Sequence, residues 1–100
     1  MIKNSKISSN INQWNIEYDQ NRFVDNENWL VSAEKTEDIL QLSNIFKENV
    51  IIDIGFYSEN YKIYVIYNND WDNPKEVFES NKTELIEYKL NKLIDKYANS

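Results

Sequence analysis

Four carboxylates and a tryptophan lie close to the only proline of the chain, in the segment NNDWDNPKEVFE at residues 68–79. The carboxylates belong to Asp70, Asp72, Glu76 and Glu79. Such side chains can bind calcium, act as a catalytic acid and base, surround a turn, or attract a basic partner protein. Each of these four interpretations makes its own demand on the rest of the chain.

A calcium loop of the EF-hand type is the first interpretation. Counted from Asn68, side chains with oxygen atoms fall on positions 1, 3, 5, 9 and 12 of a twelve-residue loop. However, Asn68 replaces the usual Asp at position 1, Lys75 occupies a position where an apolar residue belongs, and the preceding residues have the pattern of a strand. We therefore predict no metal and no cofactor, with calcium binding kept as an alternative.

Catalysis by a pair of carboxylates is the second interpretation. It needs a concave substrate site and further polar groups that orient the reactants. The chain has no His, no Cys and a single Gly, which excludes His-dependent triads, thiolate nucleophiles and Gly-rich phosphate loops. We predict that the protein is not an enzyme and has no catalytic residues.

A structural role is the third interpretation, in which residues 68–70 form a turn and Pro74 begins the next element. Trp71 would then fill the core. Trp14 and Trp29 are expected to be core residues in any case, whereas for Trp71 the core and a binding surface are both open.

A surface that binds another protein is the fourth interpretation. Binding hot spots are rich in Trp, Tyr and Arg, and surrounding carboxylates steer a basic partner. The net charge is -6, and the acid is concentrated in residues 17–79, where 14 acidic residues face five basic ones, a local net of -9. This charge opposes direct binding to nucleic acid or to an anionic membrane. The predicted partner-binding residues have Asp70, Trp71 and Asp72 at the centre and, around them, Tyr57, Glu59, Glu76 and Glu79.

The elements that must position these residues are clearest in the second half of the chain. An apolar stripe at spacings of four, three and four predicts a helix over residues 83–98. Two runs rich in β-branched and aromatic residues, 50–57 and 61–67, predict a β-hairpin, and residues 75–80 predict a short third strand.

The first half of the chain is less regular. Thr36 as a cap, with Ile39, Leu42, Ile45 and Phe46 facing inward, predicts a helix over residues 36–48. In residues 1–31 the apolar positions fit a helix and a strand equally well, and we favour a helix followed by a loop, with Trp29, Leu30 and Val31 anchoring the return. The predicted fold class is therefore α+β: one domain over residues 1–100, with a small antiparallel sheet and two or three helices packed on it.

The segments IDIGFY (52–57), YKIYVIYNNDWDNPKEVFES (61–80) and ELIEYKLNKLI (84–94) resemble those of small bacterial immunity proteins. These proteins protect cells from polymorphic toxins, including toxins of contact-dependent growth inhibition. The resemblance covers about half of the chain. It supplies no contact residues to transfer.

The resemblance implies an immunity protein that binds and neutralises a cognate toxin domain. If the acidity of this chain is complementary to its partner, the toxin domain is basic and is expected to be a nuclease. The N-terminal residues lack the apolar core of a signal peptide and no long apolar run occurs, so a cytoplasmic location is expected. The alternative is an acidic regulatory module without catalysis, or one that associates with itself through a sheet edge. The oligomeric state remains open.

Overall fold

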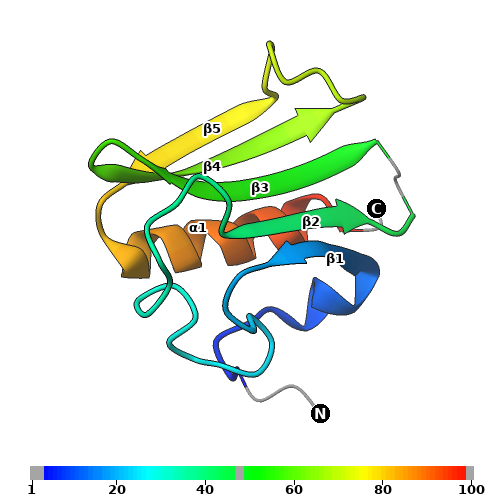
Figure 1. Ribbon diagram of the computed structural model, residues 1–100. Coiled ribbons are helices and arrows are strands. Elements are labelled where there is room, and N and C mark those ends of the chain that lie inside the picture. Colours follow the sequence, from blue (N-terminus) through cyan, green and yellow to red (C-terminus); the bar gives the residue numbers. More distant parts are fainter. Residues whose placement is uncertain (1–3, 47–48, 99–100) are drawn as a thin grey trace.

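The computed structural model describes residues 4–46 and 49–98, which form one antiparallel sheet, one α-helix and one 3-10 helix (Figure 1). The strands lie in the order β1-β2-β3-β4-β5, so that each strand pairs with its neighbour in the sequence. In chain order the elements are η1 (Ser9–Gln13), β1 (Trp14–Asp19), β2 (Leu40–Asn44), β3 (Val50–Tyr57), β4 (Asn60–Tyr67), β5 (Glu76–Ser80) and α1 (Thr83–Lys96).

Helix α1 packs across one face of the sheet, as Figure 1 shows, and this face is called the helix-covered face below. The apolar stripe predicted for residues 83–98 is confirmed, since Ile86, Leu90 and Leu93 are all buried. From the strands, Ile52 and Ile54 of β3 are among the fully buried residues of the same core. No α-helix of the described residues covers the opposite side of the sheet, which is called the open face.

The predicted hairpin is confirmed as β3 and β4, with Ile52 opposite Val65 and Ile54 opposite Ile63. The predicted third strand is β5, which pairs with β4 along the edge of the sheet. Asn68 and Asn69 both adopt left-handed backbone conformations, with φ values of 55° and 58°. Asn tolerates this region better than most residues, so the turn after β4 needs no glycine.

The helix expected near the N-terminus is wrong, because the chain forms η1 and then the edge strand β1. Ile11 and Trp14 are buried as a helical stripe would require, but Tyr18 is exposed. Backbone pairing decides between the two periodicities, since β1 lies antiparallel to β2 from Trp14 to Asp19. Val31 is also exposed, while Trp29 and Leu30 are buried as expected.

The helix predicted over residues 36–48 is also wrong, and its middle is strand β2. Leu40 and Leu42 alternate into the core with the period of a strand, whereas Ile45 and Phe46 are exposed. Residues 47 and 48 lie outside the described part of the chain. The predicted fold class is thereby corrected: the sheet has five strands, and the described residues contain a single α-helix in place of two or three.

Within the described residues, α1 is the longest helix, and no helix is both long and apolar enough to cross a membrane.

Candidate protein-binding face

The predicted binding residues do not form one cluster around Trp71. Asp70, Trp71 and Asp72 lie in the loop after β4, whereas Tyr57 and Glu59 lie at the β3–β4 turn. The whole length of β4, eight residues, separates the two groups. A strand of that length spans roughly 25 Å, so one small contact cannot include both ends.

Glu76 is directed to the other side of the sheet. It pairs with Val65 in the register, and its carboxylate accepts hydrogen bonds from the Tyr97 hydroxyl and from Lys96 Nζ, the latter at 2.7 Å. Lys89 Nζ lies 3.9 Å away. Partial burial acts to raise the pKa of Glu76, but the bonds from Lys96 and Tyr97 and the two lysine charges outweigh it and lower the pKa. Glu76 thus joins β5 to α1 and is not available to the loop.

The loop of residues 68–75 is a turn structure and does not have the arrangement of an EF-hand. Asn73 Nδ2 donates to both carboxylate oxygens of Asp70, at 3.3 Å each. Glu79 of β5, which would be the last calcium ligand, accepts a hydrogen bond from Nδ2 of Asn60 on β4 at 2.8 Å. Among the described residues, no three His, Cys, Asp or Glu side chains are grouped as metal ligands.

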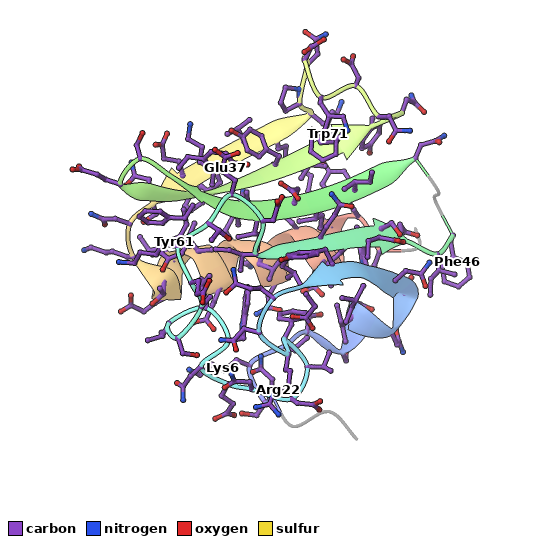
Figure 2. The ribbon with its side chains drawn as sticks, viewed as in Figure 1. Lys6, Arg22, Glu37, Phe46, Tyr61 and Trp71 are labelled. Carbon is purple, nitrogen blue, oxygen red and sulfur yellow. The ribbon has the colours of Figure 1, made fainter. Side chains whose placement is uncertain are left out.

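Trp71 remains 46% exposed, while Trp14 and Trp29 are buried as expected. Figure 2 shows Trp71 at the base of the loop, next to the end of β4. The loop returns to the sheet there, because Lys75 N–H donates to Val65 O at 2.7 Å. Trp71 is therefore an accessible aromatic side chain at one end of the sheet and is not a core residue.

The open face contains residues that were not predicted from the sequence as binding residues. In the sheet register Gln41 lies beside Asp53, Asp53 beside Tyr64, and Tyr64 beside Val77, so these four form a row across β2, β3, β4 and β5. Val77 is 53% exposed. A signal was present in the sequence: Asp53 interrupts the apolar run VIIDIGFY, and the only glycine of the chain follows two residues later.

A strap of residues 34–39 crosses part of the open face. Figure 1 shows it in front of β3, and Figure 2 shows Glu37 at its crest. Phe56 N–H donates to Thr36 O at 2.7 Å, and Ile39 N–H donates to Ile54 O at 3.0 Å. Gly55 lies between these two bonds, and a Cβ atom there would come within 2.0 Å of Glu37 O. Only glycine allows the strap to lie this close to β3.

The side-chain amide of Gln20 fixes the strap from the other side. Its Nε2 donates to Glu34 O and Thr36 Oγ1, both at 3.1 Å, and its Oε1 accepts from Glu34 N–H at 2.7 Å. The side-chain amide of Gln20 therefore supplies hydrogen bonds that a neighbouring strand would supply in a regular sheet. The strap is held in place although it belongs to no helix or strand.

Asp53 is 8% exposed and lies beside this strap. Gln41 Nε2 donates to its Oδ1 at 3.3 Å, and no other hydrogen bond reaches its carboxylate from the described residues. Burial is the main cause that raises its pKa to about 6; the bond from Gln41 opposes the shift, and the negative charge of Asp38 adds to it. A carboxylate is therefore held on the central strand of the sheet without a salt bridge to any described residue.

Two tyrosines border Asp53. Tyr57 and Tyr64 contact each other edge to face, with ring centroids 6.0 Å apart. The Tyr57 hydroxyl donates to Glu37 O at 3.4 Å, and Lys62 Nζ lies 5.7 Å from the centre of the Tyr57 ring. Burial, followed by the charge of Asp53, raises the pKa of Tyr57 to about 12, so Tyr57 carries a neutral hydroxyl group at physiological pH.

Taken together, the open face is acidic and aromatic. Strands and strap bring to it the carboxylates of Glu17, Glu37, Asp38, Asp53 and Glu79. Of the lysines described on these elements, Lys62 lies over the Tyr57 ring, and Lys35 of the strap lies over Phe56, which packs against the core. Such a face can attract and hold a basic protein surface. Comparisons with models of protein families, with curated proteins and with solved structures found no match to this chain.

Proposed function

We propose that this protein is a cytoplasmic immunity protein, which binds a cognate bacterial toxin domain through its open face and neutralises it without catalysis of its own. The observation that supports this most directly is the face itself. One side of the sheet buries the core under α1, and the other presents tyrosines, a valine and carboxylates that have almost no cation of their own.

A nuclease is the toxin class whose chemistry fits this face best. A nuclease must be basic around its substrate site, because it holds phosphate groups. An acidic inhibitor can occupy that site or bind beside it and prevent substrate entry. Its charge would accelerate the encounter, and its aromatic contacts would slow dissociation.

The test begins with the gene directly upstream, where the toxin gene of an immunity protein is expected. The C-terminal domain of that gene product is expressed in bacteria with and without this protein. We expect growth arrest by the domain alone, rescue on co-expression, and a one-to-one complex in size-exclusion chromatography. A toxic domain that is neither bound nor neutralised would contradict the proposal.

A matched pair of variants tests the face. Val77 is exposed on the open face, and Leu85 is similarly exposed on α1, at 53% and 47%. Val77→Lys places a cation on the acidic face, beside Tyr64 in the sheet register, and is expected to abolish rescue, whereas Leu85→Lys is expected to leave rescue intact. The reverse pattern would assign toxin binding to the helix side of the molecule.

The alternative function is a regulatory module that associates with itself. It is favoured by the edges of the sheet, because β1 and β5 each pair with only one strand. Light scattering coupled to chromatography, at low and at high salt, separates the two functions. Self-association through a strand edge would persist in salt, while an electrostatically steered complex would associate more slowly.

A further inference from the structure

We infer that the open face contains a receptor for one arginine side chain of the partner protein, formed by Asp53, Tyr57 and Tyr64. This inference rests on the proposed function, because the arginine is taken to come from the toxin domain. It assigns the central contact to the middle of the sheet and not to the loop around Trp71.

The first support is the unused capacity of the Asp53 carboxylate. The residue is only 8% exposed, yet its Oδ2 accepts no hydrogen bond from the described residues and its Oδ1 accepts one long bond, from Gln41. The carboxylate of Glu76, by contrast, has two lysines and a tyrosine hydroxyl as partners. A buried carboxylate normally has a cation or several donors.

The second support is the shape of the surroundings. Tyr57 and Tyr64 lie on adjacent strands, edge to face, and Asp53 is the register partner of Tyr64. A planar guanidinium group can lie against an aromatic ring while its N–H groups point at a carboxylate in its own plane. Lys62, which already lies over the ring of Tyr57, shows that this ring accepts a cation.

The third support is the fixed position of the strap. Gly55 lets the strap lie against β3, and this brings Glu37 and Asp38 close enough for their charges to raise the pKa of Tyr57. These two carboxylates increase the negative potential next to Asp53 without being paired with it. The groups that face Asp53 are thus Gln41 from β2, Tyr57 from β3, Tyr64 from β4 and the strap. The two lysines described near them, Lys62 and Lys35, lie over the rings of Tyr57 and Phe56.

An arginine is preferred over a lysine because of this geometry. A guanidinium group has donors in a rigid plane and can bond both carboxylate oxygens at once, while an ammonium group is a point charge that stays strongly hydrated. Arginine is also the only cationic residue that is enriched in binding hot spots.

The test uses L-argininamide as the probe and does not require the toxin. Isotope-labelled protein is titrated with argininamide, and the ring signals of Tyr57 and Tyr64 and the carboxyl signal of Asp53 are followed by NMR, with sodium chloride at equal ionic strength as the reference. We expect a saturable change in all three residues, and a lower apparent pKa of Asp53, because the bound cation favours its charged form.

Asp53→Asn and Glu84→Gln serve as test and control variants. The first removes the central charge and should abolish the response to argininamide. Glu59 was itself predicted to bind the partner, so the control, Glu84→Gln, removes an exposed charge on α1, away from the open face, and should leave the response unchanged. An equal response in wild type and in Asp53→Asn would overturn the receptor, and so would an equal response to L-lysinamide, which would reduce the effect to simple charge attraction.

The toxin domain gives a second and separate result. In the complex, Asp53→Asn should weaken affinity about 10- to 100-fold, mainly through faster dissociation, as expected when one partner of a buried charge pair is removed. Unchanged affinity in a wild-type complex that still forms would overturn the receptor and leave the proposed function standing. Absence of any wild-type complex would instead overturn the proposed function, while the titration with argininamide still decides whether the receptor exists.

Discussion

Glu76 and Asp53 are both carboxylates on strands of the same sheet, and their surroundings are opposite. Glu76 faces α1, where Lys96, Lys89 and the Tyr97 hydroxyl lower its pKa. Asp53 faces away from α1, where burial raises its pKa to about 6 and the only hydrogen-bond donor among the described residues is the Gln41 amide. The first carboxylate contributes to holding the fold together.

The second carboxylate works against the fold, because a charged group is kept in a site that disfavours charge. Groups of this kind are common where a protein binds something. The sheet therefore has one face that stabilises the fold and one face that is left for a partner.

The largest expected effect comes from removing apolar volume on each face. Ile54→Ala on the helix-covered face should destabilise the protein by about 2–5 kcal/mol, because Ile54 is fully buried in the core. Val77→Ala on the open face should change stability by about 0.5 kcal/mol or less, because Val77 is exposed. Chemical denaturation of both variants measures this. Equal losses would show that the open face also carries a core.

Gly55→Ala should destabilise the protein by about 1–3 kcal/mol, because the added Cβ would overlap Glu37 O and the strap must move away from β3. Hydrogen exchange locates the effect: the amides of Phe56 and Ile39, which bond across this junction, should exchange faster. The amide of Lys75, bonded to Val65 at the far end of the sheet, is the internal reference and should not change. Unchanged exchange rates of all three amides would mean that the strap shifts to make room for the Cβ atom while keeping its hydrogen bonds to β3.

Asp53→Asn should stabilise the protein by on the order of 1–2 kcal/mol near pH 7.5, less than the full pKa shift, because the carboxylate retains some contact with water. The folded-state pKa is raised to about 6 from an ordinary value of 3.8, so the wild type is destabilised as pH rises through this window. The advantage of the variant should therefore be complete above about pH 6 and vanish below about pH 4. Paired thermal melts across this range check it, and a loss of stability at pH 7.5 would contradict the contrast with Glu76.

Glu76→Gln should have the opposite sign and destabilise the protein by about 1 kcal/mol at pH 7, because Lys96 and Lys89 lose a charged acceptor. The pKa of Glu76 is lowered, so its contribution is present above the ordinary value of 4.5 and is lost as pH falls through the folded-state pKa. The difference between wild type and variant should therefore disappear in acid. A variant that is more stable than wild type at pH 7 would remove the distinction between the two faces.

The two faces also differ in how far the sequence predicts them. Strands β3 and β4, strand β5 and helix α1 follow from periodicity, because most of their apolar residues face one core with a single spacing. The segment of residues 36–48 carries two periodicities at once, and pairing with β1 and β3, which no local pattern contains, selects the strand. The same holds for residues 14–19.

The candidate site was only partly predictable for a related reason. Tyr57 and Trp71 could be selected from the sequence as candidate binding aromatics, but Asp53 becomes notable only when the strap and Gln41 lie beside it. These contacts join residues far apart in the chain, through bonds such as those of Gln20 to Glu34 and Thr36. Loop chemistry alone directed attention to residues 68–79, whose glutamate at position 76 belongs to the other face.

The smallest expected effect on stability is that of reversing the charges of the loop. Asp70→Lys with Asp72→Lys should change the free energy of unfolding by about 0.5 kcal/mol or less, because both side chains are exposed and no salt bridge involving them occurs in the described part of the chain. In the toxin complex this double variant should slow association several-fold at low salt, and the difference should shrink as salt screens the charges. Surface plasmon resonance at two ionic strengths measures both rates. The loop charges are expected to raise the association rate, whereas Asp53 is expected to slow dissociation of the bound toxin. If the double variant accelerates dissociation as much as Asp53→Asn does, the loop lies within the contact. The binding face would then extend along the whole of β4.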